Sequence, residues 1–182
     1  LLLPGLSIFI LLCTALISLN KVNDEAIKYF AESTEFRQSN DYLEQNLSGF
    51  TLMDFSVNAG QSNAVNQPAF LSAVADFSQW LLAQPEVTHV NTITDVMKRL
   101  NKSMHGDDPA YYRLPESPEL AAQYLLMYEM SLPFGLDLSN QLDLDKSATK
   151  VGITMQNLGS KEMTAIEDKA LGWFRQQYPQ YQ

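Results

Sequence analysis

The chain has 182 residues, of which 21 are acidic and 12 basic, and its net charge at pH 7 is −9. This acidity excludes a nucleic-acid-binding surface, which needs basic residues to displace counterions, and it disfavours docking on anionic lipid headgroups. A single cysteine, Cys13, excludes a disulfide within the chain and a cysteine-ligated metal site. The fold must therefore rest on a hydrophobic core.

The first 19 residues, Leu1 to Leu19, carry no charge, whereas the remainder is typical of a water-soluble domain. An uncharged helix of this length rises roughly 28 Å, about the thickness of a bilayer hydrocarbon core. We expect a transmembrane helix over residues 1–19, with a cleaved secretory signal or a buried core helix as the alternatives. The next charges, Lys21, Asp24 and Glu25, lean acidic, which indicates that the following domain lies outside the cytoplasm.

Residues 20–49 predict a helical connector, with a short helix over residues 26–48 that is capped by Gly49. A strand is favoured over residues 50–57, because aromatic and β-branched side chains partly alternate there. The polar residues 58–67 predict a loop. A helix then begins at Pro68 and ends near residue 84, since four apolar side chains recur at helical spacing: Phe70, Val74, Phe77 and Leu81.

A second strand is predicted over residues 87–94, followed by a helix that Asp95 caps and that ends near Met104. Ser117 and Pro118 predict the start of a third helix, which runs to Met130. Another strand follows over residues 149–155. Ser160 then caps a last helix with an apolar face formed by Met163, Ile166, Ala170 and Trp173 or Phe174.

This order predicts an α+β domain over residues 50–182, with a helical insert over about residues 95–145. It matches a ferredoxin-like split βαβ unit except at its end, where that unit has one more strand after the last helix. We expect either that the fold is completed differently, or that the chain is truncated before the last strand and the missing strand lies downstream of Gln182.

The sequence holds no glycine-rich phosphate loop, no nucleophile elbow and no histidine pair at metal-ligand spacing. His105, Asp107 and Asp108 belong either to an acidic metal site or to a turn rich in glycine, aspartate and proline, and the turn is favoured. Asp143 and Asp145 lack the spacing of a calcium-binding EF-hand. We therefore expect no enzyme activity, no metal and no cofactor.

The predicted third helix carries the candidate binding surface. Its aromatic and thioether side chains form an adaptable stripe, suited to a hydrophobic ligand or to contact with another subunit: Tyr124, Met127, Tyr128 and Met130. The alternative is that this stripe is simply part of the core. Because the helix is apolar nearly all round, we expect a neighbouring domain or subunit to cover the face that the core leaves free.

Two long blocks resemble a known family. The stretch DVMKRLNKSMHGDDPAYYRLPESPELAAQYLLMYEMSLPFGLDL, Asp95 to Leu138, closely resembles the first extracytoplasmic loop of bacterial exporters of the RND superfamily, in the MMPL-type branch. The stretch NDEAIKYFAESTEFRQSNDYLEQNLSG, Asn23 to Gly49, resembles the segment that joins their first transmembrane helix to that loop. The resemblance covers almost all of the chain.

The resemblance implies a polytopic protein of the bacterial inner membrane, whose periplasmic porter domains contain ferredoxin-like units. The superfamily couples proton influx to the export of hydrophobic or amphiphilic, lipid-like molecules. Its proton-relay carboxylates lie in transmembrane helices outside this chain, and no catalytic residue carries over. The implied partners are a lipid-like molecule, the membrane, the rest of the transporter and further copies of it. The rival hypothesis is a membrane-anchored extracytoplasmic ligand-binding or sensor domain.

Overall fold

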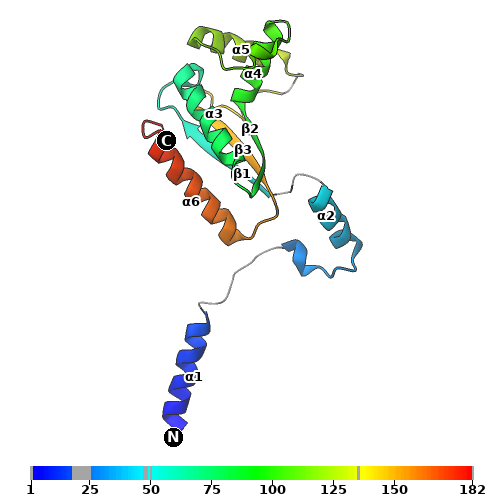
Figure 1. Cartoon of the computed structure of the whole chain (residues 1–182), viewed down its shortest axis with the longest axis vertical. Coiled ribbons are helices and arrows are strands. Elements are labelled where there is room, and N and C mark those ends of the chain that lie inside the picture. Colours follow the sequence, from blue (N-terminus) through cyan, green and yellow to red (C-terminus); the bar gives the residue numbers. More distant parts are fainter. Residues whose placement is uncertain (1, 18–25, 47–48, 50, 135, 182) are drawn as a thin grey trace.

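The computed structural model describes residues 2–17, 26–46, 49, 51–134 and 136–181. Over these residues the chain is a mixed α+β structure with one small, three-stranded antiparallel sheet and six α-helices. Figure 1 shows the sheet beside α3 and α6, with α4 and α5 gathered at one end of it. The predicted α+β class is therefore confirmed.

The N-terminal part is helical. Helix α1 (Leu2–Ile17) covers 16 residues, a rise of about 24 Å, which is shorter than the roughly 30 Å of a bilayer core. Within the described residues, no helix combines the length and the apolar character that crossing a membrane requires. Of the helix expected over residues 1–19, the structure describes residues 2–17, and residues 1, 18 and 19 lie outside the described residues.

The connector was predicted to hold one helix over residues 26–48, and this is wrong. A short 3₁₀ helix, η1 (Ala26–Tyr29), is followed by a separate α2 (Glu35–Asn46). The side chain of Thr34 accepts a hydrogen bond from the backbone N–H of Arg37 at 3.4 Å, so α2 has its own N-terminal cap. Residues 47 and 48 lie outside the described residues, so the expected capping of this helix by Gly49 is not tested.

The three strands are β1 (Thr51–Asn58), β2 (Val87–Thr92) and β3 (Ala148–Met155). Their order in the sheet is β1-β3-β2, and β3 runs antiparallel to both neighbours, with Phe55 opposite Val151. Strands β1 and β2 are therefore parallel to each other on either side of β3. The predicted strands are confirmed, although β2 ends two residues earlier than expected because α4 begins at Ile93.

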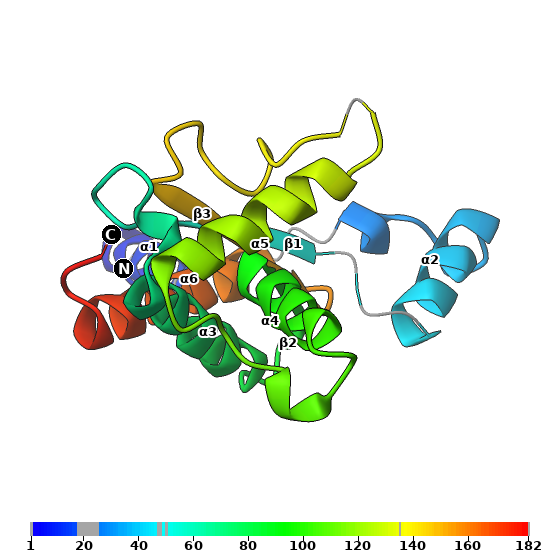
Figure 2. The ribbon, with the colours of Figure 1, turned by 90° about the horizontal axis from the view of Figure 1, so that it is seen from above.

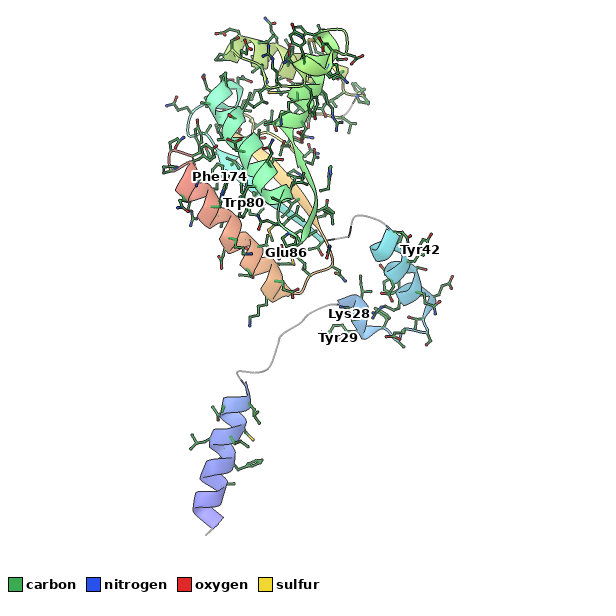
Figure 3. All side chains as sticks on the ribbon, in the orientation of Figure 1. Lys28, Tyr29, Tyr42, Trp80, Glu86 and Phe174 are labelled. Carbon is green, nitrogen blue, oxygen red and sulfur yellow. The ribbon has the colours of Figure 1, made fainter. Side chains whose placement is uncertain are left out.

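Helices α3 (Pro68–Leu82) and α6 (Ser160–Gln177) cover one face of the sheet, and Figure 3 places Trp80 and Phe174 between them. Phe77 is the centre of this layer. Its ring lies 5.5 Å from that of Phe55 on β1, 5.0 Å from that of Phe174 and 5.9 Å from that of Trp173. The four side chains predicted to form the apolar face of α3 are all buried, which confirms that prediction.

The opposite face of the sheet is largely polar. Side chains alternate along each strand, so every second one points away from the helices, and most of these are polar. Asp54, Ser56, His89 and Asn91 are exposed there. The carboxylate of Asp54 lies 3.4 Å from the ammonium group of Lys150 on the neighbouring strand. One sheet face thus holds the core, and the other faces outward with side chains of mixed charge.

Between β2 and β3 the chain forms α4 (Ile93–Met104), the 3₁₀ helix η3 (Pro109–Tyr111) and α5 (Pro118–Ser131). Ser117 caps α5 as predicted, since its hydroxyl accepts a hydrogen bond from the N–H of Leu120 at 3.2 Å. Figure 2 shows α5 lying across the end of the molecule seen from above, next to α4. The helices of this region are packed together rather than loosely attached.

Two predicted helix starts are shifted, one by three residues and one by a single residue. Thr92, not Asp95, is the N-cap of α4, and Asp95 lies in the first turn, where its charge still suits the helix dipole. Gly159, not Ser160, is the N-cap of α6. The carboxylate of Glu162 accepts a hydrogen bond from the N–H of Gly159 at 3.2 Å, and this contact fixes the start of the helix one residue earlier.

Candidate functional site

The four residues predicted to form a binding stripe on α5 point in two directions. Tyr124 is buried, and Tyr128 is half-buried against the core. Met127 and Met130 are exposed, Met130 at 78% of its surface. The stripe is therefore divided: its tyrosines belong to the interior of the α4–α5 region, while its methionines face outward.

Tyr124 is held by a polar contact inside this region. Its hydroxyl donates a hydrogen bond to Oδ1 of the buried Asn101 on α4, at 2.9 Å. The Nδ2 of Asn101 donates in turn to the carbonyl of Arg113, also at 2.9 Å. Burial raises the pKa of Tyr124 above its usual value, so the phenol stays neutral. These contacts tie α4, α5 and the chain between them into one unit, which is a structural role.

The residues from His105 to Asp108 form a turn, as favoured from the sequence. Gly106 and Asp107 both have left-handed backbone angles, with φ of 68° and 63°. The His105 ring lies 3.8 Å from the ring of Tyr111, and the Asp108 carboxylate accepts a hydrogen bond from the N–H of Ala110. Across the described residues, no group of three or more histidine, cysteine, aspartate or glutamate side chains is placed to hold a metal ion.

Asp143 likewise organises a turn. Its Oδ1 accepts hydrogen bonds from the backbone N–H groups of Ser147 and Ala148, at 2.6 and 2.7 Å. Slight burial opposes ionisation of this carboxyl, but the hydrogen bonds from Ser147 and Ala148 prevail and lower its pKa. The carboxylate is therefore occupied in shaping the approach to β3.

A groove of about 480 Å³ lies between β1 and α6, away from the predicted stripe. Its walls are mainly aromatic and aliphatic, with one cationic group, Arg175, near the end of α6. The lining comes from β1, α3, α6 and the chain after α6: Phe55, Ser56, Val57, Phe77, Leu171, Phe174, Arg175, Pro179 and Tyr181. This groove is the candidate functional site.

The groove runs along an edge of the sheet. In the part of the chain that the structure describes, β1 pairs with β3 and with no other strand. The N–H of Ala59 donates to the carbonyl of Ser147 at 2.7 Å, so odd-numbered residues of β1 face β3 with their backbone groups. The even-numbered residues turn their N–H and C=O groups towards the open edge: Leu52, Asp54, Ser56 and Asn58.

This arrangement suits an extended peptide segment. A strand added at the edge of β1 hydrogen-bonds to those backbone groups and directs alternate side chains under α6, into the groove. Phe55 and Val57 form the floor for such side chains, and Arg175 offers a charge partner for a carboxylate. The geometry suits strand addition, in which backbone pairing would supply affinity and the apolar walls selectivity.

Sequence reasoning missed this groove, although a signal was present. The segment after α6 contains two aromatic residues, Tyr178 and Tyr181. The Tyr181 ring packs edge-on against Phe70 at 5.1 Å, which brings the end of the described chain back over the core beside β1. Two aromatic residues directly after an amphipathic helix indicate that the chain packs back over the core. The sequence does not show that they meet an open strand edge, because that edge depends on the pairing of β1 with β3.

Comparisons of the chain with models of known protein families, with curated proteins and with solved structures found no match. The resemblance of the two sequence blocks to MMPL-type exporters therefore stays a prediction. The groove likewise has no relative from which a ligand could be carried over.

Proposed function

We propose that this chain is the N-terminal part of an MMPL-type exporter of the RND superfamily. The apolar segment Leu1 to Leu19 lies in the bacterial inner membrane, and residues 50–182 form a porter-type domain in the periplasm. The protein exports hydrophobic or amphiphilic, lipid-like molecules, and proton influx through helices outside this chain drives the transport. The proposal assigns no catalytic residue.

The observation that carries this proposal is the strand order β1-β3-β2. Strands β1 and β2 are parallel and enclose the antiparallel β3, and α3 and α6 lie on one face. These are the first five elements of a ferredoxin-like split βαβ unit, with α4 and α5 as its helical insertion. The family resemblance implies units of this type in the porter domains, so fold order and sequence blocks favour the same family.

We further propose that one more strand follows α6 and pairs with β1. Three features support it: the backbone groups at the edge of β1, the apolar groove under α6, and the position of Pro179 and Tyr181 at that groove. In a ferredoxin-like unit the last strand lies beside the first. The groove between β1 and α6 is then the seat of that strand, and the cargo path lies elsewhere.

In the proposed mechanism the porter domain receives a lipid-like molecule from the outer leaflet or the periplasm. Rigid-body shifts then open and close its path alternately, and proton flow biases the two states. The packed aromatic layer around Phe77 is consistent with rigid-body motion of the domain, because a close-packed core resists internal deformation. The exposed Met127 and Met130 remain the candidates for cargo or subunit contact.

The direct test is transport by the full-length protein in proteoliposomes. We expect export of a fluorescent lipid analogue when a proton gradient is imposed, and its loss when an ionophore collapses the gradient. Export that continues unchanged without the gradient contradicts the proton-driven mechanism. Proteoliposomes that contain a variant with its transmembrane carboxylates neutralised are the matched control.

A second test separates the exporter from the anchored sensor domain. The gene is read beyond Gln182. An alternating apolar segment followed by five hydrophobic spans supports the exporter and the completing strand together. A single span followed by a cytoplasmic signalling module instead supports the sensor and contradicts the exporter.

A further inference from the structure

The C-terminal end of α5 and the loop after it form an exposed apolar surface, here called the apolar tip. Its side chains are more than half exposed: Leu126, Met130, Phe134, Leu136 and Leu144. Phe134 is fully exposed and Leu144 is 96% exposed. Large apolar side chains gathered in this way on a water-soluble surface mark an interaction site more often than single exposed residues do.

The apolar tip is one surface, not a scatter of residues. Leu126 and Met130 lie one turn apart on α5, which places them on one ridge, and Phe134 follows in the loop, because α5 ends at Ser131 and Leu132 is already extended. The loop that carries Leu144 is held against the same helix, since the ammonium group of Lys146 lies 3.5 Å from the carboxylate of Glu129. A small cavity lined by both Glu129 and Leu144 confirms that the loop and the helix adjoin.

The rim of the apolar tip is acidic. Asp137 and Asp145 are exposed beside it, and Glu129 and Asp143 line the cavity next to Leu144. Hydrogen bonds from the side chain and the backbone of Ser139 lower the pKa of Asp137, so its charge persists at mildly acidic pH. Lys146, paired with Glu129, is the cation at this cavity, so the charge around the tip is negative.

This charge decides which occupant fits. A second copy of the chain presents the same acidic rim, and the net charge of −9 adds repulsion between copies. An anionic bilayer surface repels the rim in the same way. A partner with an apolar face and basic flanks, in contrast, satisfies both the exposed side chains and the carboxylates.

We propose that the apolar tip docks a basic amphipathic helix of a partner protein. The ridge of Leu126 and Met130 packs into the groove between side chains of the partner helix, as ridges do between helices, and Phe134 adds apolar contact from the loop. Lysine or arginine residues beside the partner's apolar stripe then lie opposite Asp137 and Asp145. This proposal concerns a surface that the proposed porter unit leaves uncovered, and it gives Met130 a partner helix as its contact in place of cargo.

The test uses the 182-residue chain in phosphatidylcholine nanodiscs, which carry no net charge. The probe is a fluorescein-labelled amphipathic helical peptide of leucine and lysine, and fluorescence anisotropy measures its binding above that to empty nanodiscs. A leucine–glutamate peptide of the same pattern is the charge control. We expect the lysine peptide to bind at least about tenfold more tightly than the glutamate peptide.

Variants locate the site. Phe134→Ser combined with Leu144→Ser should weaken binding of the lysine peptide by about tenfold or more, since both side chains are truncated at the centre of the contact. Leu82→Ser, at an exposed leucine of α3, is the matched control and should leave binding unchanged. Asp137→Asn combined with Asp145→Asn should weaken binding and reduce its dependence on salt.

Three results overturn the proposal. One is equal binding of the two peptides, and another is unchanged binding by the Phe134→Ser, Leu144→Ser variant. The third is evidence for another occupant. Protein-loaded nanodiscs would pair with each other, or would dock on phosphatidylglycerol vesicles, and the Phe134→Ser, Leu144→Ser variant would lose that association. Because the substituted side chains are exposed, the far-ultraviolet circular dichroism of each variant should match that of the parent chain.

Discussion

The phenol of Tyr178 donates a hydrogen bond to the carboxylate of Asp76, 2.5 Å away. This bond joins the chain just after α6 to α3. Helices α3 and α6 cover the same face of the sheet. It raises the pKa of Tyr178 to about 12, first through the hydrogen bond itself, then through partial burial and the nearby negative charge. The contact therefore links the packing of α6 to the protonation of one side chain.

Tyr178→Phe should lower the free energy of unfolding by about 1 kcal/mol at pH 7, the usual net contribution of such a bond. The fold favours the neutral phenol, whose pKa is near 10 in the unfolded chain. Its stabilising contribution is therefore full below pH 10 and is lost as the pH rises towards 12. Urea unfolding monitored by tryptophan fluorescence at pH 7 to 11.5 measures both effects.

The matched control is Tyr112→Phe, because Tyr112 is exposed. That variant should keep the alkaline loss of stability, whereas Tyr178→Phe should reduce it. An equal decline in both variants above pH 10 would contradict a specific role for the Tyr178–Asp76 bond.

Asn101→Ala should destabilise the α4–α5 region by about 2 to 3 kcal/mol. The buried amide joins the Tyr124 hydroxyl to the Arg113 carbonyl, and its removal leaves both without that partner. Hydrogen exchange read by mass spectrometry should show faster exchange in α4 and α5 and little change in α3. Asn91→Ala, at an exposed site on the outer sheet face, is the control, and equal effects of the two changes would sink the prediction.

Gly49→Ala should be more damaging than Gly60→Ala. Both glycines have left-handed backbone angles, with φ of 89° and 79°, so alanine costs about 1 kcal/mol at either position. At Gly49 an added Cβ also collides with the backbone carbonyl of Met155 at the end of β3, while at Gly60 it meets open space. Thermal unfolding of the two variants measures the difference, and equal melting temperatures would refute this reading of the Gly49 backbone.

Cys13 is a built-in reporter of the proposed membrane attachment, since it is the one cysteine of the chain. In membrane vesicles we expect a water-soluble maleimide to leave Cys13 unlabelled until detergent is added, although this thiol is exposed in the isolated structure. Ser39→Cys combined with Cys13→Ser should be labelled at once, because Ser39 is an exposed position of α2. Rapid labelling of Cys13 in intact vesicles would contradict burial of this segment in the bilayer.

Several elements were predictable because their signals are local. Pro68 at the first position of α3, the repeat from Phe70 to Leu81, and the Ser117 cap of α5 each act within a few residues. The helix starts were harder. Thr92 rather than Asp95 occupies the N-cap position of α4. The helix begins where β2 ends, and the end of β2 depends on its pairing with β3.

The site was less predictable than the fold. The predicted stripe on α5 is divided because the buried Asn101 accepts a hydrogen bond from Tyr124 inside the domain, whereas Met130 is 78% exposed. That partner lies 23 positions away, beyond the reach of helical periodicity. The groove beside β1 was missed for a related reason: it is formed by three distant segments, and none of them carries a chemical motif of its own.

The place of β3 in the sheet also constrains how the chain can fold during synthesis. Strand β3 is central, yet it is the last of the three strands in the sequence, and Thr51 pairs with Met155 about 100 residues further along. Strands β1 and β2 therefore have no sheet partner until α4, α5 and β3 have all emerged. A nascent chain stopped before residue 148 should expose both strands, so its yield should depend strongly on chaperones that shield unpaired strands.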